Sequence, residues 1–164
     1  METLGQLRND DKNRAVRFER RYPARPEAVW AALTQPEKLS RWLADAVAFD
    51  ERVGGRVDLR FGDDSDQVAR GAIIAYEPPR VLEYEWHWPG QTSSSVRFEL
   101  SPDDGGTLLV LDHRGLPRDA APAYAAGWHA YLDRLGAQFD GDVPDWDARF
   151  SEVLPKYRDL SGAR

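Results

Sequence analysis

Residues 123–139 read AYAAGWHAYLDRLGAQF, and this stretch decides the fold. Its large apolar residues recur every three or four positions, which places them on one face of a helix. They are Tyr124, Trp128, Tyr131, Leu132, Leu135 and Phe139. This face is wide, and a helix of this length can cross a sheet. The sequence therefore predicts a long helix that covers one side of a sheet.

The sheet is expected from the residues before this helix, where apolar and charged side chains alternate in several short runs. In residues 82–88, for example, Leu82, Tyr84 and Trp86 alternate with Glu83 and Glu85. The links between the predicted strands are short, whereas parallel strands need crossovers of about a dozen residues or more. We therefore expect a mainly antiparallel sheet with one apolar and one charged face, which needs cover on one side only.

Two short helices are predicted between the first strand, which ends at Tyr22, and the rest of the sheet. Pro26 suits the first turn of a helix. Two apolar stripes at helical spacing follow it. The first stripe is Val29, Trp30 and Leu33, and the second is Leu39, Trp42 and Leu43. Thr34 and Glu37 form a capping-box pattern, so Thr34 is expected to cap the second helix.

Four blocks in this order resemble bacterial homologues of the heat-shock-protein-90 ATPase activator, which belong to the START-like (SRPBCC) superfamily. The blocks are YPARPEAVWAALTQPEKLSRW (residues 22–42), Gly54-Gly55, EPPRVLEYEW (residues 77–86), and GLP (residues 115–117) with the helix after it. The resemblance covers roughly residues 14–137. It implies an α+β helix-grip fold: a curved antiparallel sheet wrapped around a long C-terminal helix, with two short helices after the first strand and a cavity between sheet and long helix.

Three segments are predicted: a flexible N-terminus (1–13), the START-like helix-grip domain (14–138) and a C-terminal helical extension (139–164). The extension carries a second apolar stripe, which Pro155 is expected to interrupt. The stripe is Trp146, Phe150, Val153, Leu154 and Tyr157. This segment is expected either to dock on the domain as an extra helix or to form the interface of a homodimer.

Composition excludes several classes of function. Cysteine is absent, which excludes disulfides, thiolate metal sites and a cysteine nucleophile. The formal net charge is -6, without the cationic face that nucleic-acid binding requires. We also find no signal peptide, membrane-spanning segment, metal-ligand spacing or phosphate-binding glycine loop. A cytoplasmic protein without a metal, cofactor, nucleic-acid partner or membrane partner is expected.

Aromatic side chains are the strongest indication of a site, since there are six Trp, six Tyr and six Phe residues against one Met. Ligand pockets are mostly apolar, with a few polar groups that fix orientation. We predict a ligand pocket lined by Trp30, Trp42, Phe61, Tyr84, Trp86, Trp88, Phe98, His113, Tyr124, Trp128, Tyr131, Leu132 and Leu135. The alternative is that these rings fill the space between sheet and helix completely.

His113 is the one candidate for catalysis, because it follows Leu109 and Leu111 in strand phase and can point into the cavity as a general base. The alternative is a hydrogen-bonded structural histidine. The sequence favours non-catalytic binding of a small hydrophobic or aromatic molecule. Two alternatives are a protein-interaction role resembling that of a chaperone ATPase activator, and a cyclase- or dehydratase-like enzyme that uses His113 or a cavity tyrosine.

Overall fold

The computed structural model describes residues 3–62 and 66–162. Along these residues the chain forms β1 (Gln6–Asp10), β2 (Asn13–Tyr22), α1 (Pro26–Thr34), α2 (Pro36–Trp42), β3 (Ala46–Phe49), β4 (Arg56–Arg60), β5 (Val68–Glu77), β6 (Val81–Trp86), β7 (Ser94–Asp103), β8 (Gly106–Leu116), α3 (Ala121–Ala137) and α4 (Trp146–Ser161). Residues 1–2 and 163–164 of the predicted terminal segments lie outside the described residues.

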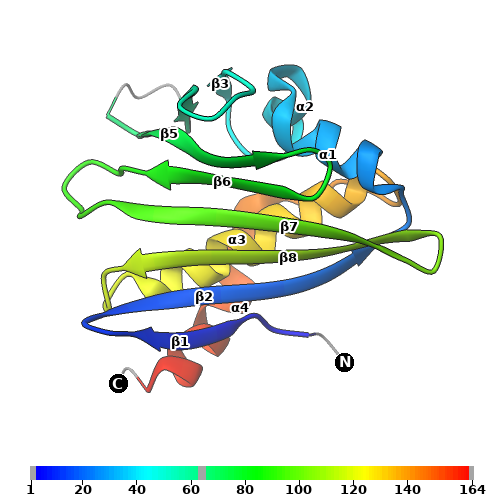
Figure 1. Cartoon of the computed structure of the whole chain (residues 1–164). Coiled ribbons are helices and arrows are strands. Elements are labelled where there is room, and N and C mark those ends of the chain that lie inside the picture. Colours follow the sequence, from blue (N-terminus) through cyan, green and yellow to red (C-terminus); the bar gives the residue numbers. More distant parts are fainter. Residues whose placement is uncertain (1–2, 63–65, 163–164) are drawn as a thin grey trace.

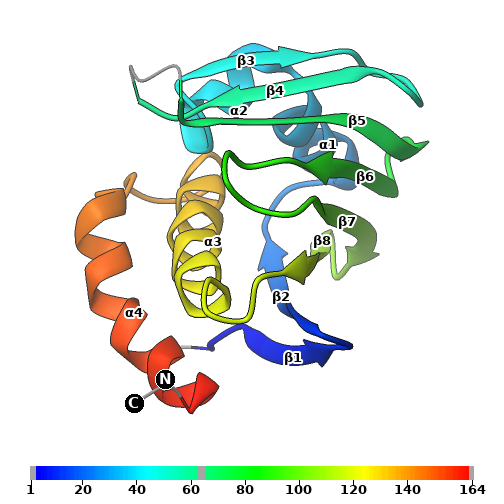
Figure 2. The ribbon, with the colours of Figure 1, turned by 90° about the vertical axis from the view of Figure 1, so that its left-hand side faces the viewer.

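The strands form one antiparallel sheet in the order β1-β2-β8-β7-β6-β5-β4-β3 (Figure 1). The sheet curls around α3, and α1 and α2 connect β2 to β3 at one end (Figure 2). The predicted α+β helix-grip fold is therefore confirmed. So are the antiparallel sheet and the two short helices, which follow β2.

Alternation along the strands produces the two faces of the sheet. Leu82 of β6 pairs with Phe98 of β7, and Tyr84 pairs with Val96. All four side chains are buried on the face that α3 covers. Glu83, between them, turns to the other face and forms an ion pair with an arginine of β7. Apolar burial thus fixes the register, because a slip of one residue would exchange the two faces.

Part of the segment that was predicted as a flexible end, residues 1–13, forms a strand. Residues Gln6–Asp10 form β1, which pairs with β2 so that Leu7 lies opposite Val16. A tight turn joins the strands, with Asp11 at a φ of 55°. Leu4 and Leu7 pack against the core. These two apolar side chains and the pairing with the edge of β2 attach a segment that is otherwise polar.

The start of α2 differs from the predicted capping box. Thr34 still belongs to α1, and its hydroxyl donates to the backbone carbonyl of Trp30 at 2.9 Å. Gln35 precedes α2, and no side chain caps this helix. Thr34 is buried, so its hydroxyl bonds to the carbonyl one turn back instead of reaching forward.

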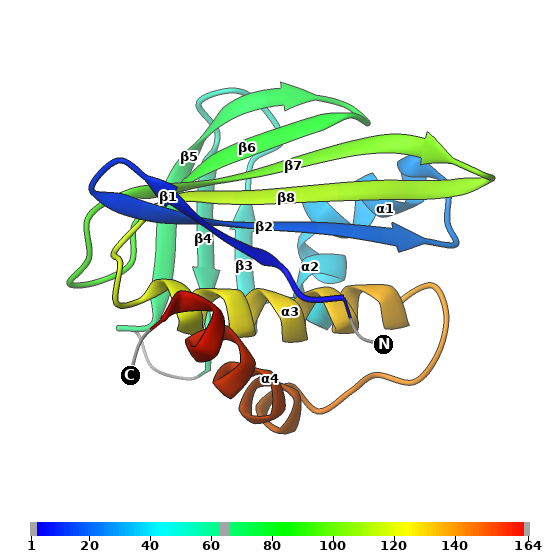
Figure 3. The ribbon, with the colours of Figure 1, turned by 90° about the horizontal axis from the view of Figure 1, so that it is seen from below.

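The C-terminal extension is a helix docked on the domain, which is one of the two predicted alternatives. Figure 3 shows α4 on the side of α3 that faces away from the sheet. Val153 and Tyr157 of its apolar stripe are fully buried within the chain. Pro155 does not interrupt α4, contrary to the prediction. Val153 and Tyr157 lie before and after the proline, and their packing compensates for the backbone hydrogen bond that Pro155 cannot donate.

Candidate functional site

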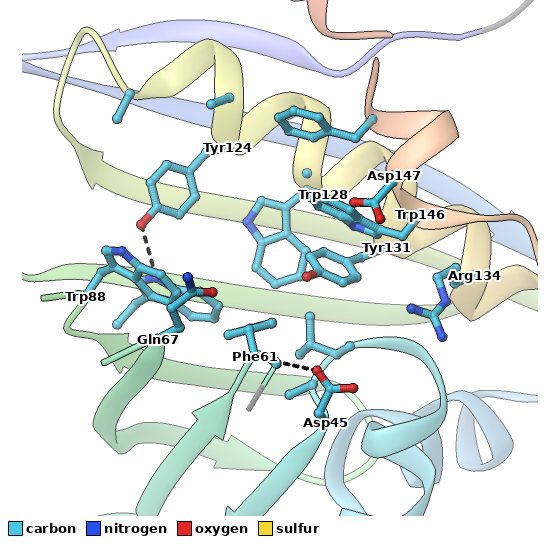
Figure 4. Close-up of a pocket in the computed structure, with 18 of the residues that line it drawn as sticks. Asp45, Phe61, Gln67, Trp88, Tyr124, Trp128, Tyr131, Arg134, Trp146 and Asp147 are labelled. Atoms are coloured by element: carbon cyan, nitrogen blue, oxygen red, sulfur yellow. Dashed lines mark hydrogen bonds between the residues drawn. The ribbon is translucent and has the colours of Figure 1, made fainter. Parts of the chain in front are cut away.

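A pocket of about 640 Å³ lies beside α3, between the end of β6 and the first turns of α4. Its walls are mainly aromatic (Figure 4). The rings are those of Phe61, Trp86, Trp88, Tyr124, Trp128, Tyr131, Trp146 and Phe150. This volume lies within the range of roughly 300–1,000 Å³ that small-molecule sites occupy.

Helix α3 provides the central wall, because Tyr124, Trp128 and Tyr131 lie one helical turn apart on the same face. Gly127 lies between these turns and leaves space for the first residue of α4. A Cβ atom at Gly127 would lie 3.7 Å from the ring of Trp146, which is ordinary contact distance. An alanine would therefore also fit here, and the approach of α4 does not depend on a glycine at this position.

Contacts among the rings hold the walls in place without any ligand. The ring of Phe61 has its centroid 5.8 Å from that of Trp88 and 5.9 Å from that of Tyr131. On the α4 side, Trp146 stacks on Phe150 at 4.9 Å with an interplanar angle of 18°. Trp146 also lies 5.1 Å from Tyr131. Such ring pairs add to the stability gained from burial alone.

Polar groups gather at two places in the pocket. Trp86 donates its indole N–H to the Tyr124 hydroxyl at 3.3 Å, and that hydroxyl donates to Gln91 at 2.8 Å. Elsewhere, the Asp45 carboxylate accepts the backbone N–H of Gly62 at 2.5 Å. Burial raises the pKa of Tyr124 and of Tyr131 above the ordinary tyrosine value. Both hydroxyls therefore stay protonated at neutral pH. Tyr124 uses its hydrogen for Gln91, so Tyr131 is the member of this pair that can donate to a ligand.

The structure brings six of the predicted site residues together around this pocket: Phe61, Trp86, Trp88, Tyr124, Trp128 and Tyr131. The other seven are buried in the core and do not line this pocket: Trp30, Trp42, Tyr84, Phe98, His113, Leu132 and Leu135. The two alternatives therefore apply to different regions. Rings fill the space where α3 meets the middle of the sheet. Next to this filled region, rings line the pocket.

Two tryptophans illustrate the filled region. Trp42 is completely buried and donates its indole N–H to the carbonyl of Ala32 at 2.8 Å. Trp30 packs against Tyr76 of β5, with ring centroids 5.5 Å apart. Both rings join α1 and α2 to the domain and have no face left for a ligand.

His113 is a structural residue in this fold. It is completely buried, and its Nδ1 atom accepts the indole N–H of Trp128 at 2.9 Å. Its Nε2 atom lies 2.8 Å from the hydroxyl of Ser94, which donates to the carbonyl of Trp86. Burial lowers the pKa of His113 to about 3. Both ring nitrogens are thus engaged by side chains of the protein, and His113 lies behind the rings of Trp86, Tyr124 and Trp128 without lining the pocket itself.

Sequence reasoning missed the contribution of α4 to the pocket. Trp146, Asp147 and Phe150 line it, together with Asp45 and Arg134 from other elements. The stripe that contains Trp146 and Phe150 was visible in the sequence, but its periodicity does not say which surface it covers. Charged residues such as Asp45 lie in connections, where no periodic pattern marks them.

Other kinds of site find no support in the described ranges. Within residues 3–62 and 66–162, no three His, Cys, Asp or Glu side chains gather as metal ligands. None of the helices in that part of the chain has both the length and the apolar character needed to span a membrane. The aromatic pocket is a site that the geometry offers for a bound molecule.

The family model described as Activator of Hsp90 ATPase homolog 1-like protein matches residues 23–140, which is most of the chain. The chain belongs to this family. The START-like resemblance of the sequence is thereby confirmed. The match ends before α4, so three lining residues of the pocket lie outside the matched region. A search of curated proteins finds no match.

Solved structures agree with this assignment. The crystal structure of CalU16 from Micromonospora echinospora is 28% identical, covers 97% of this chain and 98% of that one, and has a TM-score of 0.81. A Bordetella parapertussis protein encoded by gene BPP1335 is 31% identical, covers 92% and 87%, and has a TM-score of 0.72. DynU16, a protein of the dynemicin biosynthetic locus, is 25% identical over 79% of this chain and 47% of that one, with a TM-score of 0.68.

Proposed function

We propose that the chain binds a small hydrophobic or aromatic molecule, without catalysis, in the pocket beside α3. The observation that carries this proposal is the ring-lined volume of about 640 Å³. Its walls are held by ring-to-ring contacts and by the docked helix α4. Binding to a pre-formed site costs little ordering of side chains.

The polar groups of the pocket support binding rather than bond breaking. Tyr124 and Tyr131 have raised pKa values and act as hydrogen-bond donors near neutral pH, not as bases. The histidine expected to act as a base is sequestered by Trp128 and Ser94. The cyclase- or dehydratase-like alternative therefore retains only the pocket tyrosines as candidates.

A screen of aromatic compounds tests the proposal, with thermal shift and native mass spectrometry on protein purified without added ligand. We expect at least one compound to raise the melting temperature and to appear in the mass spectrum in a one-to-one complex. If no hydrophobic or aromatic compound stabilises the folded chain, the proposal is rejected.

A matched pair of variants locates the binding. Ala123 is an exposed α3 residue that lines the pocket, and Ala148 is an exposed α4 residue that does not. Ala123→Trp adds a ring at the pocket and is expected to abolish the shift caused by a hit compound. Ala148→Trp adds the same ring elsewhere and should leave that shift unchanged. Equal effects of both variants would place the binding outside the pocket.

A second candidate function is regulation of a heat-shock-protein-90 chaperone, and the family match is the observation that favours it. Pulldown of the host chaperone with this chain, followed by an ATPase assay, tests it. Binding together with a changed ATPase rate would support this role, whereas neither effect would remove it. A homodimer remains a prediction. It was expected from the apolar stripe of the extension, but Val153 and Tyr157 of that stripe are buried within one chain.

A further inference from the structure

Two buried hydrogen-bond donors of the pocket lining have no acceptor in the described part of the chain. They are the indole nitrogen Nε1 of Trp146 and the guanidinium nitrogen Nε of Arg134. The Tyr131 hydroxyl, on the same lining, is a third donor that forms no hydrogen bond within residues 3–62 and 66–162. An unpaired buried donor costs free energy, and an acceptor on a ligand can recover part of this cost.

The N–H edge of the Trp146 indole lies against α3 at Gly127. A Cβ atom at Gly127 would lie 3.7 Å from Cζ2, which is bonded to the same ring carbon as Nε1. Gly127 and Trp146 both line the pocket, so this edge belongs to its wall. Trp146 is half-buried and begins α4, so its indole can tilt toward the pocket without unpacking the core. A ligand can then reach an N–H that neither the described residues nor solvent satisfies.

The other two donors lie on α3. The ring of Tyr131 has its centroid 5.1 Å from that of Trp146. Arg134 follows Tyr131 by three residues, so the two side chains are neighbours on the helix surface. One terminal nitrogen of Arg134 donates to the carbonyl of Arg41 at 3.1 Å, which holds the guanidinium at the edge of the pocket (Figure 4). The wall formed by α3 and α4 therefore offers donors to a ligand.

The charges of the lining favour a neutral acceptor over an anion. The lining holds two carboxylates, those of Asp45 and Asp147, and the single guanidinium of Arg134. Its net charge is therefore one negative unit, and the whole chain carries -6. This field opposes an anionic ligand. A carbonyl oxygen has lone pairs for hydrogen bonds and enters an apolar site without the cost of removing a full charge from water.

We propose that the pocket selects a neutral aromatic molecule that carries a carbonyl group. The ring of this ligand lies among the aromatic walls, and its carbonyl oxygen accepts the indole N–H of Trp146. A ligand of this kind offers an acceptor to a wall that has donors in excess. The inference rests on the proposed function and specifies the class of ligand.

Two probes of the same shape test the inference: 1-(naphthalen-2-yl)ethanone and 2-(prop-1-en-2-yl)naphthalene, in which a methylene group replaces the carbonyl oxygen. Both are titrated into the full chain, in buffer with the same small fraction of methanol, and followed by ¹H–¹⁵N spectra of the indole groups. The Trp146 signal is assigned by its absence from the spectrum of Trp146→Phe. We expect the ketone to move the Trp146 indole proton downfield relative to the alkene, because only the ketone accepts a hydrogen bond there.

A variant connects the preference to this N–H group. Trp146→Phe keeps a ring and removes the donor, so the ratio of ketone affinity to alkene affinity should fall about two- to tenfold. The ratio is compared because the alkene leaves water more readily than the ketone, and this difference is the same for every variant. Trp42→Phe makes the same replacement at a core residue that does not line the pocket, and should keep the wild-type ratio.

The outcomes separate this inference from the proposed function. If both probes bind but Trp146→Phe keeps the wild-type ratio, or both probes move the Trp146 proton equally, the pocket remains a binding site and the selection of a carbonyl is overturned. If naphthalene-2-carboxylate binds more tightly than the ketone at low salt, the pocket selects an anion and the neutral class is overturned. If neither probe causes a saturable shift, the inference and the proposed function are both contradicted for ligands of this size.

Discussion

The hydroxyl of Tyr157 lies 2.7 Å from Nδ1 of His129, which ties the middle of α4 to α3. The same oxygen accepts the backbone N–H of Gly5 at 2.7 Å, so the segment before β1 is tied in as well. About two helical turns closer to the pocket, Arg149 of α4 donates to Asp133 of α3 at 2.6 Å. These contacts hold the helix that supplies Trp146 to the pocket.

Replacement of Tyr157 by Phe should lower the free energy of unfolding by about 1–3 kcal/mol, because the N–H of Gly5 and the ring of His129 lose their partner while they remain buried. Urea denaturation followed by circular dichroism measures this. Leu160→Ala, on the exposed side of α4, is the control and should change stability by less than about 0.5 kcal/mol. Wild-type stability of Tyr157→Phe would show that this hydroxyl does not hold α4.

Stability should decrease at acidic pH because two histidines are buried in neutral form. Burial lowers the pKa of His113 to about 3, and burial with the nearby Arg20 lowers that of His129 to about 4. Both histidines are expected to have a pKa near 6.5 once unfolded. Their contribution is complete above about pH 6.5. It falls as the pH decreases toward the folded values, since the unfolded chain then binds protons that the folded chain does not.

The variant His113→Gln tests this assignment. Glutamine can accept from Trp128 and donate to Ser94, but it does not titrate. Between about pH 6 and 4.5, the slope of unfolding free energy against pH should decrease by about 1.4 kcal/mol per pH unit relative to wild type. An unchanged slope in His113→Gln would contradict the buried neutral state of His113.

Two glycine replacements should have opposite effects. At Gly127 in α3 an added Cβ meets only Trp146 at 3.7 Å, so Gly127→Ala should stabilise the chain by up to about 1 kcal/mol through helix propensity. At Gly71 in β5 an added Cβ would lie 2.1 Å from the backbone oxygen of Glu85, so Gly71→Ala should destabilise it markedly. Thermal denaturation of both variants measures the effects, and an equal change in both would refute the packing described for these sites.

Trp42→Phe should separate the core from the pocket. It removes the indole N–H that bonds to Ala32 and leaves a gap in a fully buried position, at a cost of about 1–4 kcal/mol. The affinity for naphthalen-2-ylmethanol should stay within about twofold of wild type, since Trp42 does not line the pocket. A large loss of affinity in a variant that remains folded would place Trp42 at the site.

The sequence was sufficient for the fold because local patterns agree with it throughout. The stripe from Tyr124 to Leu135 required a covering helix, and alternation such as that around Tyr84 required a two-faced sheet. The pattern could not identify β1, whose polar residues are ordered by pairing with an edge. It also could not show that Trp42 and Trp86, both large and apolar, have different roles. That difference depends on how closely α3 approaches the sheet at each position.

The pocket was predictable only in part, for a similar physical reason. Six lining rings follow from strand and helix phase, whereas Trp146 and Phe150 depend on which surface α4 covers. That surface is chosen by contacts between distant residues, such as Arg149 with Asp133. Sequence periodicity carries no information on such pairs.

The central claim is that a small aromatic molecule binds in the pocket, and the six tryptophan indole N–H signals test it most directly. These signals are followed by ¹H–¹⁵N correlation spectra during titration with naphthalen-2-ylmethanol. We expect the pocket residues Trp86, Trp88, Trp128 and Trp146 to shift in a saturable manner while Trp42 stays in place. Absence of any saturable shift, or shifts confined to Trp30 and Trp42, would contradict the account.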